Sequence, residues 1–375
     1  MKQLPLTVKR SIELLGLCLL IALFSVANSI IMPLLMAFFI SLMLLPIFRF
    51  LRKIRIPEII AIVLVILTAA LIIIAILTFF SLQVASLVKD FPQLEKNLNV
   101  HWNTLSNWIN RNLNLSADQQ IKVLQEQGGK LLNNAGTYLS GAAVSITNVF
   151  VFMGLLPIYV FLILFYKNLL LRFIFLWFNR DDHPQVESAL RETEVMVKSY
   201  LIGLVIQVTY MTVLLGGILM IVGIKHAMLI AIIFAILNLI PYVGALIGNI
   251  IGVLLTLTSS SELWHVFAVL IVISVVQFLD NNILMPRIVG SKVKINALVS
   301  IIGVIIGGTL AGVSGMFLSL PLIAILKIIF DHTTDFRHWG ILLGDERPGL
   351  SPMTNPAVRL RNRHVRKPGE EEKEE

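Results

Sequence analysis

The chain has 375 residues, of which 57% are apolar and only 14% are charged, and its formal net charge is +8. Its mean hydropathy is +0.87, whereas a soluble domain has about 25% charged residues. These values exclude an ordinary water-soluble enzyme and a largely disordered chain. The single cysteine, Cys18, excludes a disulfide-built secreted domain. The composition therefore predicts an all-α polytopic membrane protein.

Residues 1–80 contain the apolar runs of three transmembrane helices. About 20 apolar residues cross a hydrocarbon core that is about 30 Å thick. The run 11–48 is interrupted near Asn28, Ser29 and Pro33, which predicts two helices joined by a tight turn. Residues 56–80 predict the third helix. A secretory signal peptide is the alternative for the first helix, but no small-x-small cleavage site follows, so we interpret it as an uncleaved anchor.

Residues 81–140 differ from the runs on either side because they are polar, with apolar residues at helical spacing. This pattern predicts amphipathic helices on the extracytoplasmic side that pack together or rest on the membrane surface. Trp102 and Trp108 fit both interpretations, as interfacial anchors or as the core of a small cap. Residues 141–198 then predict a fourth span, at about 144–166, and a cytoplasmic loop.

Residues 199–335 predict a transport core built from broken helices. A fifth span covers about 200–222, but the later apolar pieces are short: 227–240, 242–258, 263–279, 296–311 and 316–330. Broken or re-entrant helices are tolerated inside a membrane only where protein or a water-filled cavity satisfies their backbone. The chain thus predicts about eight transmembrane helices, or six spans plus two re-entrant hairpins.

The two hairpins suggest an inverted repeat in the C-terminal half. One unit is the span 200–222 followed by a hairpin at Pro241; the other is the span 263–279 followed by a hairpin at Gly312 and Gly315. The units run in opposite directions, which is how many secondary transporters are built. The alternative is a set of ordinary short helices without symmetry.

The distribution of basic residues predicts that both termini are cytoplasmic. With this orientation all Lys and Arg residues lie inside except Lys89, Lys96, Arg111, Lys122, Lys130 and Lys225. Arg287, Lys292 and Lys294 then act as cytoplasmic anchors. The polar tail 336–375 lies near anionic lipid headgroups, so the positive charge indicates the lipid bilayer as partner and not nucleic acid.

Motifs for enzymatic chemistry are absent from the sequence. There is no nucleotide-binding loop, no His-Glu-x-x-His and no Cys-x-x-Cys, and the seven histidines are scattered. We therefore expect no enzymatic activity, no cofactor, no metal site and no ATP-driven pump within the chain.

The first candidate site closes the run 263–279. A carboxylate, three amides, a helix-breaking proline and a guanidinium lie close together there: Gln277, Asp280, Asn281, Asn282, Pro286 and Arg287. An ionisable group between apolar spans is costly unless it faces protein, water or ligand, so Asp280 is a functional candidate. The alternative is that Asp280 only ends a helix at the interface and that the amides join helices by hydrogen bonds.

The second candidate site is the turn Asn238, Pro241, Tyr242 and Gly244. Proline and glycine free backbone carbonyls at a hairpin tip, and the amide and phenol suit a small polar solute or a desolvated cation. A helix kink filled by neighbouring side chains is the alternative. Weaker candidates on the fifth span are Gln207, Thr209 and Tyr210.

The sequence from Asp280 to Asn296 resembles the C-terminal signature of the autoinducer-2 exporter (AI-2E) family of bacterial permeases. The resemblance continues through Gly303, Gly307, Gly308, Gly312, Gly315, Leu320 and Pro321, and the turn Pro241–Gly244 is similar too. One departure is Asn296-Ala297, because many members carry a proline after the polar residue.

The resemblance implies a multi-pass inner-membrane transporter without a nucleotide-binding subunit. Some members are associated with export of the signal autoinducer-2, and others with exchange of sodium or lithium for protons. The residues expected to line or support the pathway are Asn238, Tyr242, Gln277, Asp280, Asn281 and Asn282. Those expected to shape it as hinges are Pro241, Gly244, Pro286, Gly312, Gly315 and Pro321.

Three functions remain open from the sequence. The leading hypothesis is secondary export of a small polar solute, and exchange of a monovalent cation for protons is the alternative within transport. A scaffold for envelope assembly is the alternative outside transport, although broken helices offer a passive anchor no advantage. Close helix packing at Gly303, Gly307 and Ala311 would also permit a homo-oligomer.

Overall fold

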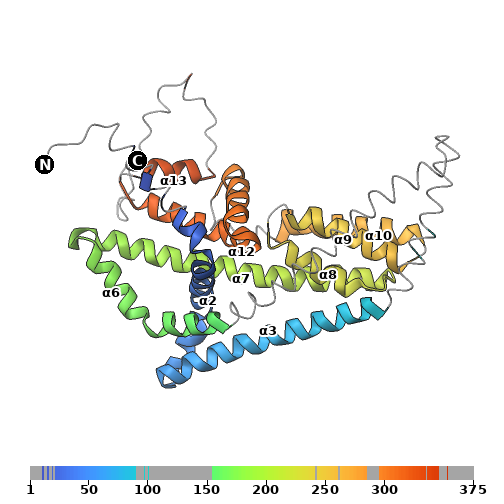
Figure 1. Cartoon of the computed structure of the whole chain (residues 1–375), viewed down its shortest axis with the longest axis horizontal. Helices are drawn as coiled ribbons and strands as arrows, with labels where there is room; N and C mark the ends of the chain where they lie inside the picture. The colour runs from blue at the N-terminus through green and yellow to red at the C-terminus, as the bar shows by residue number, and fades with distance from the viewer. Residues whose placement is uncertain are drawn as a thin grey trace, which may run out of the picture.

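The computed structural model describes residues 22–89, 154–240, 243–260, 262–284, 295–334 and 336–345, together with a few single positions outside these ranges. All regular structure in these residues is helical, which confirms the predicted all-α class (Figure 1). The labelled elements are α2 (Asn28–Lys53), α3 (Glu58–Lys89), α6 (Lys167–Trp177), α7 (His183–Ile221), α8 (Ala227–Leu237), α9 (Val243–Ser259), α10 (Leu263–Leu279), α12 (Ala297–Asp331) and α13 (Arg337–Leu343), with a 3-10 turn at Arg180–Asp182 and a π turn at Asp280–Leu284.

Five of the described helical stretches are long and apolar enough to cross a membrane by length and composition, and one of them is α12, which is kinked at Gly312. A sixth span results if Gly154–Phe165 and Lys167–Trp177, which are bent by 64°, count as one broken helix. The protein is therefore a multi-pass membrane protein, but the described residues do not establish the total of about eight spans. Residues 101–153 lie outside them, with both tryptophans of the expected extracytoplasmic segment and the start of the fourth span.

Three helix boundaries differ from the predicted ones. The expected turn near Asn28 is at Ala27, whose φ of -91° and ψ of 15° interrupt the helix, while Pro33 lies inside α2. Helix α3 continues to Lys89, beyond the expected end at residue 80. Helix α7 begins at His183 and not near residue 200, because its polar first turns are helical too, with one ion pair at i,i+4 spacing between Arg191 and Glu187.

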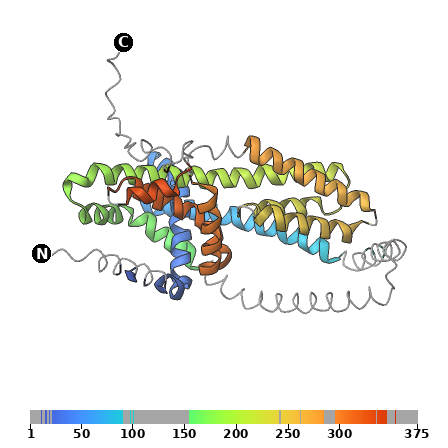
Figure 2. The same cartoon turned by 90° about the horizontal axis from the view of Figure 1, so that it is seen from above.

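Helix α7 is shared by two apolar cores (Figures 1 and 2). Its residues Met196 to Leu204 pack with α2 and α12, and its residues Met211 to Leu219 pack with α8 and α10. A third core joins α2, α3 and the helix Gly154–Phe165. Gln207 lies on α7 between the first two cores, so a polar side chain marks the place where they meet.

Helices α8 and α9 form an antiparallel hairpin beside α7 and α10. Gly248 faces Phe234 and Gly252 faces Ile230. Residues later in α9 thus lie opposite residues earlier in α8, as expected for antiparallel helices. Helix α8 has 11 residues, a length of about 17 Å, and is too short to cross about 30 Å of hydrocarbon. The hairpin is therefore built from two short apolar helices, and whether the pair is re-entrant stays a prediction.

Helix α12 is also a hairpin, because its 35 residues form two helical arms on either side of a sharp kink. Ala311 and Gly312 have non-helical backbone angles, and Gly312 has a φ of 58° that favours glycine. A methyl group on Gly315 would overlap the backbone carbonyl of Gly307, which shows how closely the two arms approach. The first arm, from Ala297 to residue 310, is about 21 Å long and cannot span a membrane alone.

The two ends of the α12 hairpin are fixed at its base. Asn296 caps the first arm by accepting from Val299 N at 2.9 Å, and its amide donates to the carbonyls of Leu342 and Gly344 at 2.7 and 3.0 Å. Helix α13 thereby covers the beginning of α12, while at the hairpin's turn Asn28 of α2 donates to the Leu310 carbonyl at 3.0 Å.

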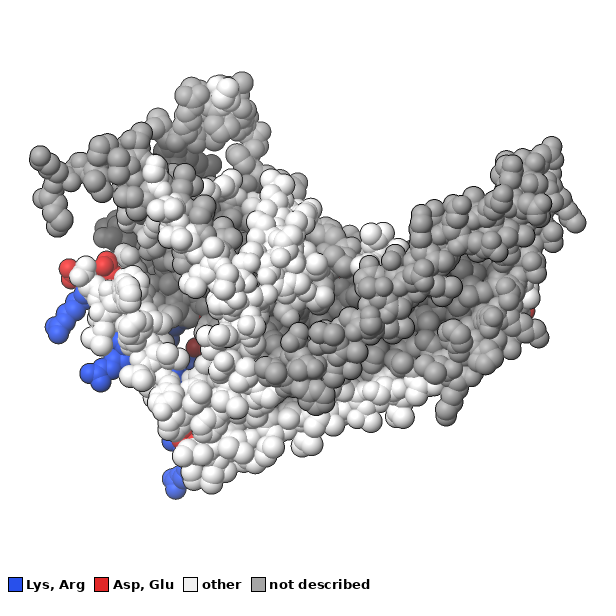
Figure 3. Space-filling model, in the orientation of Figure 1, with Lys and Arg blue, Asp and Glu red and all other residues white. Residues whose placement is uncertain are grey.

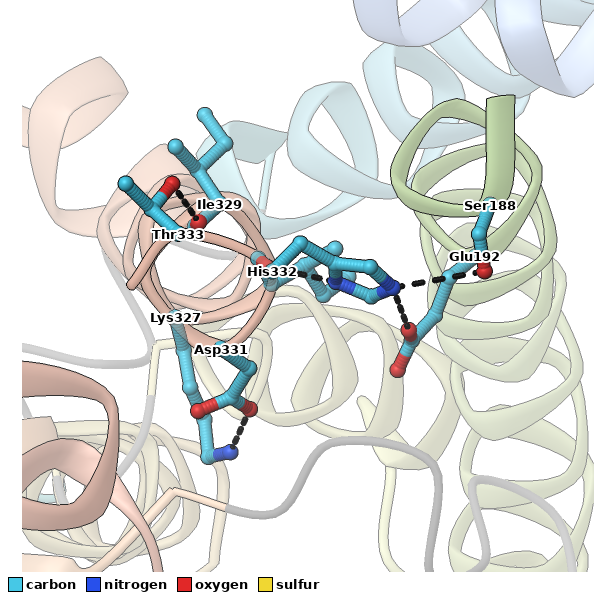
Figure 4. A network of polar contacts seen from close by, with 8 residues as sticks. Ser188, Glu192, Lys327, Ile329, Asp331, His332 and Thr333 are labelled. Atoms are coloured by element: carbon cyan, nitrogen blue, oxygen red, sulfur yellow. Dashed lines mark hydrogen bonds and ion pairs between the residues drawn. The ribbon is translucent and has the colours of Figure 1, made fainter. Parts of the chain in front are cut away.

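The second arm ends in a polar network with the beginning of α7 (Figure 4). His332 Nε2 lies 3.3 Å from Ser188 Oγ and 3.7 Å from a Glu192 carboxylate oxygen, and Lys327 pairs with Asp331 on the same arm. The base of the α12 hairpin thus lies near the start of α7, whereas the base of the α8–α9 hairpin lies near its end. Whether the two units are related by symmetry stays a prediction.

Charged side chains mark one end of the molecule. On the face drawn in Figure 3, most coloured Lys, Arg, Asp and Glu atoms lie over the end that α6 and the beginning of α7 occupy in Figure 1. Cross-helix ion pairs join the helices there: Arg49 with Glu194 at 2.6 Å and Lys167 with Glu58 at 2.5 Å. On the face drawn, the charged side chains of the described residues thus gather at this end.

Candidate functional site

A cavity of about 290 Å³ lies where the two apolar cores meet on α7. Its walls come from α7, the turn of the α8–α9 hairpin, the end of α10 and the second arm of α12. The lining residues are Tyr200, Leu204, Gln207, Asn238, Leu239, Ala245, Gln277, Asp280, Asn281 and Leu320. The volume is close to the lower end of the roughly 300–1,000 Å³ of small-ligand pockets. The cavity can therefore hold a ligand of several heavy atoms.

Asp280 is the only acidic residue in the cavity wall, and it is 1% exposed. Its Oδ2 atom accepts from Gln207 Nε2 at 3.0 Å and from Asn238 Nδ2 at 3.2 Å. These bonds bring together three helices whose residues are far apart in the chain. The sequence alone did not distinguish a buried carboxylate from one at an interface, and this geometry supports the buried one.

The backbone at Asp280 places the carboxylate inside the protein. The helix does not end at this residue, as the interpretation of a simple helix terminus requires, but continues through the π turn Asp280–Leu284. A π turn adds one residue to a helical turn and often occurs at functional sites. It rotates the residues around it, so Asp280 is buried while Asn281 and Asn282 are exposed.

The hairpin turn reaches the cavity because α8 and α9 approach closely at Gly244. A methyl group on Gly244 would overlap the backbone of Asn238, so a larger residue would separate the two arms there. Asn238 follows α8 directly and reaches Asp280 from this position. The glycine thus allows the amide to meet the carboxylate.

The cavity does not lie halfway along the helices that form it. Gln207 is 14 residues before the end of α7 at Ile221, and Asp280 is 17 residues after the start of α10 at Leu263. These separations correspond to about 21 and about 25 Å along the helix axes. Asp280 directly follows the end of α10, whereas on α7 the cavity lies 24 residues after the start at His183 and 14 before the end.

Four of the six predicted pathway residues line the cavity: Asn238, Gln277, Asp280 and Asn281. Asn282 does not line it, and its amide donates to the Phe278 carbonyl at 2.9 Å on the exposed side. Tyr242 lies outside the described residues, as do Pro241, Pro286 and the anchors Arg287, Lys292 and Lys294. Of the remaining predicted hinges, Gly312 is at the α12 turn, Gly315 is at the arm contact and Pro321 is buried inside the second arm.

Sequence reasoning gave too little weight to one residue and missed five others. Gln207 was only a weaker candidate, yet it is 4% exposed and bonds directly to Asp280. An amide within a transmembrane helix could have identified Gln207 as a site residue, because a buried amide needs a hydrogen-bond partner inside the protein. The missed lining residues are Tyr200, Leu204, Leu239, Ala245 and Leu320. Apolar residues carry no comparable signal. Thr209 bonds to its own helix at Val205 and is exposed.

Within the described part of the chain, no group of three or more His, Cys, Asp or Glu residues could hold a metal ion. The polar groups of the cavity wall are one carboxylate, the phenol of Tyr200 and the amides of Gln207, Asn238, Gln277 and Asn281. Such a set can bind a polar solute or a cation by hydrogen bonds and charge, but it offers no nucleophile paired with a base.

Comparison with known proteins supplies independent information. Residues 14–335 match the model of the AI-2E family transporter. The protein YrrI of Bacillus subtilis (strain 168) is 26% identical over 321 residues, which are 82% of this chain and 87% of that protein. AI-2 transport protein TqsA of Escherichia coli (strain K12) is 26% identical over 324 residues, covering 85% of this chain and 90% of TqsA. YhhT of the same strain is 25% identical over 342 residues, which are 90% of this chain and 94% of that protein.

Proposed function

The chain belongs to the AI-2E family of transporters, and from that premise we propose that it carries a small polar solute across the bacterial inner membrane through the Asp280 cavity. The observation that carries this proposal is a buried carboxylate with amide partners at the junction of two apolar cores. An ionisable group within a span is costly unless it faces ligand, water or protein partners. A scaffold has no use for such a site.

The arrangement of the two cores supports a mechanism of alternating access. The core with α2 and α12 and the core with α8 and α10 share α7 but meet at the cavity. A small movement of one core against the other would open the cavity to one side and close it to the other, as in transporters with broken helices. Each core would move as a rigid body because its interior is closely packed.

The position of the cavity supports export. The basic residues predict that the side on which α7 begins is the cytoplasm, where both termini would lie, and the end of α10, which carries Asp280, would face that side. A solute would then be loaded from the cytoplasm. We propose AI-2 as the first cargo to test, because TqsA is named for its transport.

Cysteine labelling tests the pathway without knowledge of the cargo. In a chain whose Cys18 is replaced by serine, we expect Asn238→Cys to react with a membrane-impermeant thiol reagent. The matched control is Leu215→Cys, which replaces a fully buried core residue on α7. Labelling of the cysteine at 238 no faster than that at 215 would contradict a water-accessible cavity.

Flux through proteoliposomes tests the cargo. We expect AI-2 efflux by the wild-type protein and a loss of at least tenfold in Asp280→Asn and Asn238→Ala, with Thr209→Ala as the exposed control on α7. Efflux equal to that of empty liposomes would remove AI-2 as cargo. Proton movement driven by a sodium gradient would instead favour cation exchange.

A further inference from the structure

We propose that the ligand of the Asp280 cavity carries a primary or secondary ammonium group, so that the solute class is a small organic cation with N–H donors. This inference rests on the proposed function, because it assigns a ligand to the same cavity. It goes further by selecting among polar solutes according to charge and hydrogen-bond capacity, and it predicts that an uncharged cargo such as AI-2 binds more weakly than an ammonium ligand.

The first step is the hydrogen-bond inventory of the cavity. Three side-chain oxygens are buried without a donor among the described residues: Asp280 Oδ1, Gln207 Oε1 and Gln277 Oε1. Gln207 Nε2 and Asn238 Nδ2 each donate one hydrogen bond to Asp280 Oδ2, and Gln277 Nε2 donates to Asn281 Oδ1. The unmet capacity of the buried oxygens is therefore to accept hydrogen bonds from a ligand, while the Tyr200 hydroxyl and the Asn281 amide also line the cavity and can donate.

The amide orientation supports this inventory. A carboxylate only accepts hydrogen bonds, so the nitrogen of Gln207 has to face Asp280 and its oxygen has to face elsewhere. Turning the amide would place two acceptor oxygens against each other. Gln207 Oε1 is thus an acceptor because of Asp280 and not by an arbitrary choice of orientation.

The second step is charge. None of the ion pairs among the described residues includes Asp280. A carboxylate that is 1% exposed is strongly stabilised by a positive charge at its unused oxygen, since water is largely excluded. An anionic ligand would add a second negative charge at the same place, and a neutral ligand would leave the first one unbalanced.

The third step is the shape and lining of the cavity. Its volume of about 290 Å³ exceeds that of a single ion, and Leu204, Leu239 and Leu320 form apolar walls beside the acceptors. Apolar walls suit the carbon skeleton of an organic cation. An ammonium group at the acceptors with a short skeleton against the leucines satisfies both parts of the cavity.

Four small molecules of similar kind test the proposal by calorimetric titration of the full-length protein in detergent at neutral pH. Ethanolammonium has charge and N–H donors, ethylene glycol has donors without charge, choline has charge without N–H donors, and glycolate has the opposite charge. We expect ethanolammonium to bind at least tenfold more tightly than ethylene glycol or choline, the factor that one charge-assisted hydrogen bond supplies. Glycolate should not bind measurably.

Substitution then assigns the preference to the cavity. Asp280→Asn should lower the affinity for ethanolammonium at least tenfold, to that for ethylene glycol, whereas Thr209→Ala should leave it unchanged. If Asp280→Asn fails to fold, the ranking of the four molecules on the wild-type protein still decides. Equal binding of ethylene glycol, choline or glycolate would overturn the proposal, and so would binding of sodium ions without binding of ethanolammonium.

The two proposals can fail separately. If ethanolammonium binds at Asp280 but the cysteine at 238 is not labelled, the ligand class stands and the pathway is wrong. If that cysteine is labelled and Asp280→Asn abolishes flux of a neutral solute while ethanolammonium does not bind, the pathway stands and the ligand class is wrong.

Discussion

The α12 hairpin predicts different effects for three glycine-to-alanine substitutions. At Gly315 a methyl group would overlap the Gly307 carbonyl, and backbone cannot move aside as a flexible side chain can. Gly312 has open space around it but a φ of 58° and a ψ of -142°, a region that only glycine occupies easily. Gly217 in α7 has neither constraint, since nothing lies within 4 Å of an added methyl group.

The magnitudes follow from these three environments. Gly315→Ala should cost about 1–3 kcal/mol, because the arms must separate as in an overpacked core. Gly312→Ala should cost about 1–3 kcal/mol through backbone strain alone. Gly217→Ala should instead stabilise α7 by about 0.5–1 kcal/mol, the usual preference of a helix for alanine over glycine. The first and third variants should thus change stability in opposite directions.

Thermal unfolding of the purified variants in detergent micelles measures this order. We expect the Tm of Gly217→Ala to equal or exceed that of the wild-type protein, and the Tm of the other two to be lower. Ethanolammonium affinity should fall in Gly315→Ala, because the second arm carries Leu320 into the cavity wall. An unchanged or higher Tm for Gly315→Ala would refute the close approach of the two arms.

Three further substitutions test contacts that hold the hairpin and the helices around it. Asn28→Leu leaves the Leu310 carbonyl without its amide donor and should lower the free energy of unfolding by about 1–3 kcal/mol. The measurement is a lower Tm, and an unchanged Tm would show that this hydrogen bond does not stabilise the protein. Asn296→Ala removes the cap of α12 and its link to α13, which should cost about 0.5–2 kcal/mol and speed proteolysis near the C-terminus, whereas Asn296→Ser should keep part of the cap. Reversing either charge of the exposed pair Arg49 and Glu194 should cost roughly 0.2–1 kcal/mol of stability, and reversing both should restore most of it. A double variant no more stable than the single variants would show that the pair contributes nothing.

Short-range sequence patterns predicted the helices because they depend on neighbours along the chain. The apolar runs gave the class, and the shortness of 227–240 suggested a hairpin before any packing was known. The helical boundaries were less predictable. Polar residues from His183 onward look like a loop by hydropathy, yet they form the first turns of α7, where Arg191 and Glu187 make an i,i+4 ion pair.

The candidate site depends on contacts between distant segments, which periodicity does not reveal. Asp280 and Asn238 were each conspicuous within their own segment, but their hydrogen bond joins residues 42 positions apart. Gln207 is 73 positions from Asp280, and its role depends on which face of α7 is turned toward α10. That rotation results from the packing of both cores. The apolar wall at Leu320 was unpredictable for the same reason.

The shortness of α8 has a consequence for how the protein is made. A segment of 11 residues is about half the length that holds a helix across the bilayer, and the backbone groups at its turn need protein partners. Helix α7 precedes α8 in the chain and supplies one of the surfaces against which α8 packs. Helix α10 supplies another such surface, but it is synthesised later. During biosynthesis the hydrogen bond between Asn238 and Asp280 therefore cannot form before α10 has been made.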